Sequence, residues 1–213
     1  MNYTEFRKMV RKWPIISTRD IMLSSRGGQA MRNQLERWKR KGLLTMLRRG
    51  MFLMNENDRV IDPSRTYIAN QLYNPSYVSL EYALGYYGLI PDRVSDVTSI
   101  TTKKTMRYSN AAGVFTYQHV MPKAFRAFTA QKDEEGLSFL MAEPEKALAD
   151  YCYLHLALFQ KKIRGVFEES IRLQNVDSLR TKKVIEYAAF FENKKLLNVC
   201  KTLCVLIKEE GGR

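Results

Sequence analysis

The chain has 213 residues, 45% of them hydrophobic, and a formal net charge of +13 at pH 7. This composition is typical of a globular protein with one large core or two smaller ones, and no apolar run approaches the roughly 18 residues that cross a membrane. The charge is uneven: residues 1–54 hold 13 Lys and Arg against 3 Asp and Glu, residues 55–159 hold 10 against 12, and residues 160–213 hold 12 against 7. A basic segment of this kind predicts a polyanionic partner, either nucleic acid or an anionic membrane surface.

The start of the chain, "MNYTEFRKMVRKW", is basic and amphipathic but lacks the apolar stretch and cleavage site of a secretory signal, so we expect a cytoplasmic protein. The three cysteines agree with this expectation because an odd count disfavours a disulfide framework. Cys200 and Cys204 stand one helical turn apart in the apolar segment "LLNVCKTLCVLI", so we expect them in a core; a redox or metal role is the alternative. No spacing typical of a zinc site is present, and we expect neither a metal nor a cofactor.

Three helices are predicted in the first 41 residues. Residues 3–12 place apolar and basic side chains on opposite helical faces, and Trp13-Pro14 ends this helix. Ser17 or Thr18 can cap a short second helix, which is followed by a turn at residues 26–28. A third helix over residues 29–41 has its apolar residues at i, i+4 and i+7, and Gly42 closes it.

The hydrophobic period changes after Gly42. "LLTML" and "MFLM" are short apolar runs on either side of Arg48-Arg49-Gly50, which predicts a β-hairpin with glycine in its turn. Helix, helix, turn, helix and hairpin is the order of a winged helix-turn-helix, so we predict such a DNA-binding domain over residues 1–55.

In a winged helix-turn-helix, the N-terminal part of the third helix meets base edges in the major groove. Gln29, Arg32 and Asn33 lie on the side of this helix away from its apolar stripe, and such side chains form paired hydrogen bonds with adenine or guanine. We expect the surrounding cations to contact the DNA backbone or the minor groove, with helix and hairpin gripping the same duplex; they are Arg26, Lys39, Arg40, Lys41, Arg48 and Arg49. A membrane surface is the weaker alternative, because the apolar stripe is needed to pack the other helices.

The polar segment 55–62, "NENDRVID", predicts a domain boundary, and we place the second domain at residues 63–213. Helices are predicted in "PSRTYIANQLYNP" and, with Ser79 as N-cap, in "SLEYALGYYGLIPD". The runs "DVTSITTKKTMRY" and "GVFTYQHVM" predict a pair of strands, "GLSFLMA" another strand, and "EPEKALADYCYLHLALF" a helix beginning at its proline. The remainder is predicted to be helical. The fold class is therefore α+β, with a small antiparallel sheet and a helical C-terminal part in the second domain.

From about residue 10 to residue 155 the chain resembles the AbiEi antitoxins of the type IV toxin–antitoxin systems that act in abortive infection. The resemblance is carried by "RRGMFLM", "YIANQLYNPSYVSLEYALGYYGLIPD", "VTSITT", "FTYQHV" and "AEPEKALADYCYL". It implies an antitoxin that represses its own operon by binding inverted repeats in the promoter and that counteracts a nucleotidyltransferase-like toxin through its second domain. Family members are described as acting without a stable toxin complex. Inverted repeats would also imply at least two copies per site, so self-association on DNA is possible.

The family's antitoxin motifs fall on a set of residues in the second domain: Ser79, Glu81, Tyr82, Gly88, Thr101, Glu143, Glu145, Lys146 and Asp150. Ser79, Glu81, Glu145, Lys146 and Asp150 are the expected antitoxin surface. Most of these residues also have a structural interpretation, since Ser79 can cap a helix and acidic residues favour a helix start.

No catalytic motif is found in the chain, and we expect no enzymatic activity or catalytic residues. Glu143, Glu145, Lys146 and Asp150 could imitate the carboxylate set of a nuclease, but an acidic helix start explains them more simply. The alternative to the antitoxin is a one-component winged-helix repressor whose aromatic-rich second domain senses a small ligand.

Overall fold

The first 54 residues form helices packed on a small sheet. The computed structural model describes residues 1–24, 28–160 and 162–210. The elements up to Met54 are α1 (Tyr3–Val10), β1 (Ile16–Ser17), α2 (Thr18–Ser24), α3 (Gly28–Arg40), β2 (Leu44–Arg48) and β3 (Met51–Met54). β3 is the central strand and is antiparallel to both β1 and β2. The predicted helices and hairpin are confirmed, and β1 is an addition.

Local interactions explain where these elements begin and end. The Asn2 side chain accepts a hydrogen bond from the Glu5 backbone while the Glu5 carboxylate accepts one from the Asn2 backbone, which caps α1. Gly42 has φ +70° after α3, and Gly50 has φ +81° in the hairpin turn. Both positions favour glycine because a Cβ disfavours positive φ.

The middle of the chain forms a six-stranded sheet with helices on both sides. Its main elements are α4 (Arg65–Leu72), β4 (Ser76–Val78), α5 (Leu80–Tyr86), β5 (Val97–Thr101), β6 (Met106–Asn110), β7 (Gly113–His119), β8 (Phe128–Lys132), β9 (Ser138–Ala142) and α6 (Pro144–Leu154). The strand order is β6-β7-β5-β4-β9-β8.

The sheet is mixed, so the prediction of a small antiparallel sheet is wrong. β4 pairs in parallel with β9, and β5 pairs in parallel with β7, whereas the remaining neighbours are antiparallel. The first predicted strand run is in fact two strands, β5 and β6, and neither β4 nor β8 was predicted. Side-chain alternation along a strand does not identify its partner, so the parallel pairs could not be found this way.

The C-terminal part is helical, as predicted. It contains α7 (Ile163–Gly165), which continues into a π-helical turn over Val166–Ile171, then α8 (Thr181–Ala189) and α9 (Lys194–Glu210). No helix in the described ranges combines the length and the apolar character needed to cross a bilayer.

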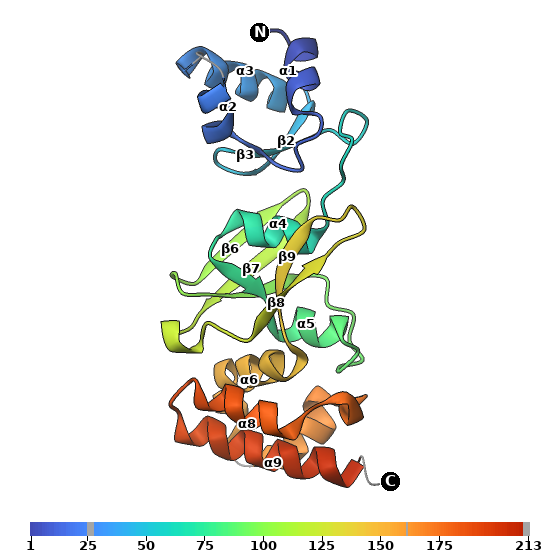
Figure 1. Ribbon diagram of the computed structural model, residues 1–213, viewed down its shortest axis with the longest axis vertical. Coiled ribbons are helices and arrows are strands. Elements are labelled where there is room, and N and C mark those ends of the chain that lie inside the picture. Colours follow the sequence, from blue (N-terminus) through green and yellow to red (C-terminus); the bar gives the residue numbers. More distant parts are fainter. Residues whose placement is uncertain (25–27, 161, 211–213) are drawn as a thin grey trace.

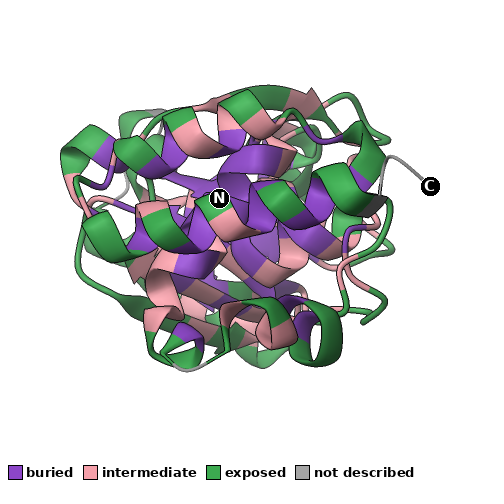
Figure 2. Cartoon of the chain, turned by 90° about the horizontal axis from the view of Figure 1, so that it is seen from below, coloured by how far each residue is buried: buried purple, intermediate pink, exposed green. Residues whose placement is uncertain are grey.

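The molecule is elongated and layered, and its N- and C-termini lie at opposite ends of the long axis (Figure 1). The N-terminal helices lie at one end, followed by the β2–β3 hairpin, α4, the six-stranded sheet, α5 and α6, and finally α8 and α9. Viewed along this axis, the helices turn buried sides inward and exposed stripes outward (Figure 2).

Two hydrophobic cores meet at the β2–β3 hairpin. Leu44, Phe52 and Met54 belong to the core of the N-terminal helices. Leu47, Met51 and Leu53 belong to the much larger core that contains the six-stranded sheet and the C-terminal helices. The hairpin is therefore buried on both sides, and it joins the two parts of the molecule.

The cysteines are buried and free, as predicted for the pair on α9. The hydrogen bond between Cys152 and Cys200, together with burial, raises the pKa of Cys152 well above its ordinary value, and burial raises the pKa of Cys204 to about 11. Because all three thiols are buried, and the raised pKa values of Cys152 and Cys204 disfavour their reactive thiolate forms, we expect a thiol reagent to modify the cysteines only as fast as the protein unfolds. Labelling followed by mass spectrometry, with and without denaturant, would check this; rapid labelling of the native protein would contradict it.

Candidate nucleic-acid interface

One face of α3 is buried and the opposite face is exposed. Met31, Leu35 and Trp38 are buried in the N-terminal core, where the Trp38 ring lies 4.6 Å from that of Phe6 and 5.5 Å from that of Tyr3 between centroids. This packing fixes the rotation of the helix about its axis. The exposed polar residues that it turns outward are Gln29, Arg32, Asn33, Arg37 and Arg40.

The outward polar side chains of α3 are held by local contacts or are free of ion pairs. Gln29 Nε2 donates to Asn33 Oδ1 at 3.2 Å, so the two amides already lie side by side. Arg32 Nη2 lies 3.9 Å from the sulfur of Met22 on α2. Neither Arg37 nor Arg40 forms an ion pair with any residue in the described ranges. These cations are available to a phosphate or a base.

The structure adds Arg37 to the predicted set and weakens the case for Lys39. Arg37 follows Asn33 by four residues and so extends the same exposed face, a signal that the helical period of the sequence already contained. Lys39 instead forms an ion pair with Glu36 at 2.6 Å. Lys41 is exposed just beyond α3, whereas Arg26 lies outside the described residues.

The hairpin holds Arg48 partly inside the molecule, so a grip on one duplex by helix and hairpin together stays a prediction that depends on Arg49 alone at the hairpin tip. Arg48 is half-buried, its Nε is buried without a hydrogen-bond partner, and its positive charge acts on Tyr117 of β7. Next to it, the Leu47 carbonyl accepts a hydrogen bond from Asn110 Nδ2 at 2.9 Å. The hairpin takes this position because the apolar side of β2 and β3 is covered by the larger core. Only Arg49 remains exposed in the turn.

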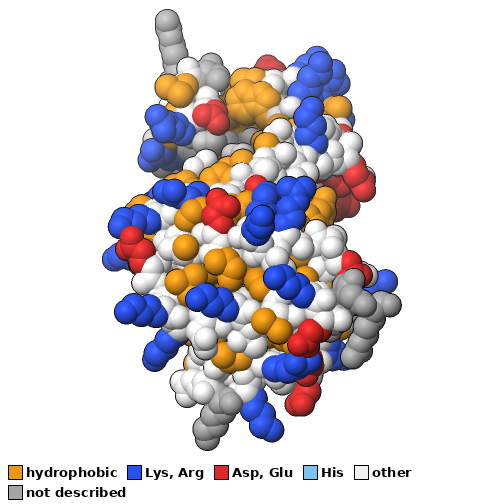
Figure 3. Space-filling view, turned by 60° about the horizontal axis from the view of Figure 1, so that its bottom comes forward, with side chains coloured by type: hydrophobic (Ala, Val, Ile, Leu, Met, Phe, Trp, Pro, Cys, Tyr) orange, Lys and Arg blue, Asp and Glu red, His pale blue; other side chains and the backbone are white. Residues whose placement is uncertain are grey.

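The other end of the molecule also carries exposed cations, but they are dispersed (Figure 3). On α9 these are Lys194, Lys195, Lys201 and Lys208. Acidic residues lie among the cations of this end, and Arg164 pairs with both Glu168 and Glu209. The outward face of α3 has no acidic residue except Glu36, which pairs with Lys39.

The expected antitoxin surface is mostly interior, which corrects that prediction. Ser79, Lys146 and Asp150 have no exposed surface, and Glu145 is 5% exposed. Lys146 and Asp150 form a buried ion pair; Asp150 Oδ2 also accepts hydrogen bonds from the hydroxyls of Ser79 and Tyr77, at 2.8 and 3.0 Å. The sequence predicted that the Ser79 side chain caps α5. It does not cap this helix, because its hydroxyl donates to Asp150 instead.

Glu81 is the member of this set that reaches solvent. It is one-third exposed, and its Oε1 lies 3.6 Å from Nε2 of His155, whose ring stacks on Tyr151 with centroids 4.3 Å apart. Both Glu81 and His155 line a shallow pocket with Asp96 and Thr98.

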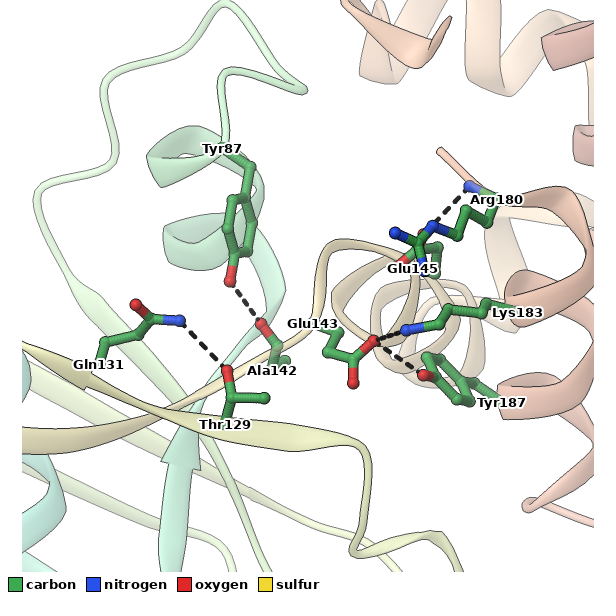
Figure 4. Close-up of polar contacts among 9 residues, drawn as sticks. All are labelled: Tyr87, Thr129, Gln131, Ala142, Glu143, Glu145, Arg180, Lys183 and Tyr187. Carbon is green, nitrogen blue, oxygen red and sulfur yellow. Dashed lines mark hydrogen bonds and ion pairs between the residues drawn. The ribbon is translucent and has the colours of Figure 1, made fainter. Parts of the chain in front are cut away.

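The acidic start of α6 is tied to the C-terminal helices (Figure 4). Glu145 Oε1 accepts a hydrogen bond from the backbone of Arg180 at 3.0 Å, and Glu143 Oε2 accepts one from the Tyr187 hydroxyl at 2.8 Å and pairs with Lys183. These carboxylates join α6 to α8. Asp150 has different partners, because Lys146, Ser79 and Tyr77 hold it in the interior.

The Glu143–Lys183 pair predicts a pH window for the attachment of α8. Burial opposes ionisation of Glu143, but the hydrogen bonds from Lys183 and Tyr187 outweigh it and lower the pKa of Glu143 below its ordinary value of 4.5. The hydrogen bond to Glu143 raises the pKa of Lys183 above 10.5. The ion pair therefore stabilises the folded protein fully between the two ordinary pKa values, 4.5 for Glu143 and 10.5 for Lys183. This stabilisation is lost as the pH falls through the lowered pKa of Glu143 or rises through the raised pKa of Lys183.

We expect Glu143→Gln to reduce the dependence of the free energy of unfolding on pH below 4.5. Denaturant titrations over a pH series would measure this. The matched control is Glu186→Gln, on the exposed side of α8. If the free energy of unfolding of the Glu143 variant fell below pH 4.5 as steeply as that of the wild type, the Glu143–Lys183 pair would not contribute to stability.

A groove of about 970 Å³ lies between the two parts of the molecule. It is lined by hairpin residues such as Thr45 and Leu53, by the connecting segment, by Arg65 of α4 and by Tyr82 and Tyr86 of α5. In the described ranges, no group of three or more His, Cys, Asp or Glu side chains could hold a metal ion. Comparison of the sequence with protein-family models and with curated proteins finds no match.

Proposed function

We propose that this protein is a transcriptional repressor that binds duplex DNA through α3. The observation that carries the proposal is the division of α3 into a face locked in the core by Trp38 and an outward face of Gln29, Arg32, Asn33, Arg37 and Arg40. Such a helix fits the major groove, where amide and guanidinium groups read base edges.

The order of the N-terminal elements supports a winged helix-turn-helix. In this interpretation α2 and α3 form the helix-turn-helix and β2 and β3 form the wing. The wing is unusual because it packs on the second part of the molecule, so DNA contacts are assigned to α3, Lys41 and Arg49. The hydrogen bond between Gln29 and Asn33 holds both amides at the base-reading end of α3.

The second part of the molecule is proposed to be the antitoxin part, on the strength of the sequence resemblance. Four of the five residues expected at its surface are buried, so their role in this proposal is to stabilise the part that acts on the toxin. The functional partner is proposed to be a nucleotidyltransferase-like toxin, counteracted without a stable complex, and the protein itself is proposed not to be an enzyme.

A one-component repressor is the second candidate, and the groove between the two parts favours it. A small ligand bound there would contact both the hairpin and α4, and could thereby alter the position of α3. Co-expression with the product of a neighbouring nucleotidyltransferase-like gene separates the candidates. Rescue of growth supports the antitoxin, and continued arrest excludes it.

An electrophoretic mobility shift with the DNA upstream of the gene tests the repressor proposal. We expect the intact chain to shift this DNA in preference to a scrambled duplex, and we expect Arg32→Ala to relax the preference at one base position, at a cost of about 1–3 kcal/mol. Equal binding of both duplexes by the intact chain would remove the proposal.

A further inference from the structure

The strand β8 is an open edge of the six-stranded sheet. It is the last strand in the order and has β9 as its neighbour on one side. Thr129 and Ala130, in the middle of β8, are exposed. An edge strand presents unpaired backbone N–H and C=O groups, and proteins that avoid edge-to-edge pairing place charged residues or proline there.

The two edges of the sheet differ in this respect. The edge strand β6 has Arg107 within it and follows exposed Lys103 and Lys104. β8 has a single charge, Lys132, at its end and none at its three central positions. Each strand thus contains one charged residue, and exposed Arg126, Glu134 and Glu135 flank β8 as the lysines flank β6. The difference is that the three central positions of β8 carry no charge, whereas those of β6 include Arg107.

The sequence of β8 is complementary to itself in an antiparallel arrangement centred on Ala130. In that register Ala130 faces Ala130 of the second copy, Thr129 faces Gln131, and Phe128 faces Lys132, which allows a cation–π contact. Directly paired residues lie on the same face of a sheet, and Ala130 is paired with Leu140 of β9. The join would create a row of Leu140, Ala130, Ala130 and Leu140 across the two copies.

This row would be apolar across both copies, and at its centre the exposed Ala130 of each chain would lie against that of the other. Leu140 is 36% exposed although it lies in a strand next to the sheet edge. We propose that two copies of this chain associate through their β8 strands about a twofold axis at Ala130, forming one continuous sheet. The inference does not depend on DNA binding. A twofold pair would also carry two α3 helices related by the symmetry of an inverted repeat.

Disulfide trapping of Ala130→Cys tests the register directly. Directly opposed residues of antiparallel strands have Cα atoms about 4.5–5.5 Å apart, which is within the range that a disulfide spans. We expect air oxidation catalysed by copper phenanthroline to convert most of this variant into a covalent dimer on a non-reducing gel. The native cysteines are buried and should leave the wild-type chain monomeric on the same gel.

Ser109→Cys is the matched control, because Ser109 is exposed on the other edge strand, β6. Cross-linking of Ala130→Cys no greater than that of Ser109→Cys would overturn the proposal. As a second measurement, we expect the sedimentation mass of the wild type to rise towards twice the monomer mass with concentration, and that of Ala130→Lys to stay at the monomer mass. Ala130 is exposed, so this variant should keep the wild-type circular dichroism spectrum; identical sedimentation of both proteins would also overturn the proposal.

Discussion

Replacing Arg37 and Arg40 together by alanine is expected to weaken the binding of duplex DNA by about a hundredfold or more, since a hydrogen bond to a charged group contributes roughly 1.5–3 kcal/mol and 1.4 kcal/mol is about tenfold in affinity. Both residues lie on the outward face of α3, and neither forms an ion pair with a described residue. They follow the proposed base-reading residues towards the end of the helix, where phosphate contacts are expected. Their removal should therefore reduce affinity for all sequences alike.

Measuring DNA affinity as a function of salt concentration would distinguish the loss of phosphate contacts from unfolding of the variant. Each phosphate contact contributes about 0.9 to the slope of log affinity against log salt concentration, so the double variant should lower the slope by roughly 1.8. The control removes the same charge from the opposite end of the molecule, by Lys194→Ala with Lys201→Ala on the exposed side of α9. If this control lost as much affinity for DNA as the α3 variant, binding would depend on overall charge, which would contradict the proposed role of α3.

The substitution Lys146→Met is expected to lower the free energy of unfolding by about 3–5 kcal/mol, because it leaves a buried carboxylate without its cation. Lys146 has no exposed surface; its Nζ donates to the Tyr77 hydroxyl at 2.9 Å and lies 4.7 Å from the centroid of the Phe191 ring. Burial lowers the pKa of Lys146 and raises that of Asp150, so each charged form depends on the other.

A double-mutant cycle in urea would measure this coupling. We expect Lys146→Met combined with Asp150→Leu to cost much less than the sum of the single substitutions, because no uncompensated charge remains. Ser79→Ala provides a milder comparison, since it removes one of the hydrogen bonds that Asp150 accepts. If the double substitution lowered the free energy of unfolding by the sum of the two single effects, Lys146 and Asp150 would stabilise the protein independently of each other.

Much of the local structure could be predicted from the sequence. The spacing of Met31, Leu35 and Trp38 determines which side of α3 is buried, and therefore which side carries Gln29, Arg32 and Asn33. The same spacing implied that Arg37 is exposed, although it was not among the predicted contacts. Gly50 marked the hairpin turn because few other residues adopt positive φ there.

The partners of each element could not be predicted in the same way. Arg48 looked like an exposed hairpin tip, yet the apolar side of its hairpin packs on a core built from residues far along the chain. Lys146 and Asp150 looked like a charged surface, yet Tyr77 and Ser79 satisfy them in the interior. Burial of a charge depends on donors and acceptors that the fold brings together from distant positions, and a local pattern does not contain them.

The amino-acid sequence alone determined the helices, the hairpin, the concentration of positive charge in the first 54 residues and the outward side of α3, because these follow from periods of a few residues. The tertiary structure alone decided that the hairpin joins two cores, that the sheet is mixed and that β8 is its open edge. The physical reason is that apolar surfaces and buried charges are stabilised by residues that are distant in the sequence. A pattern of a few neighbouring residues does not show which distant residues these are.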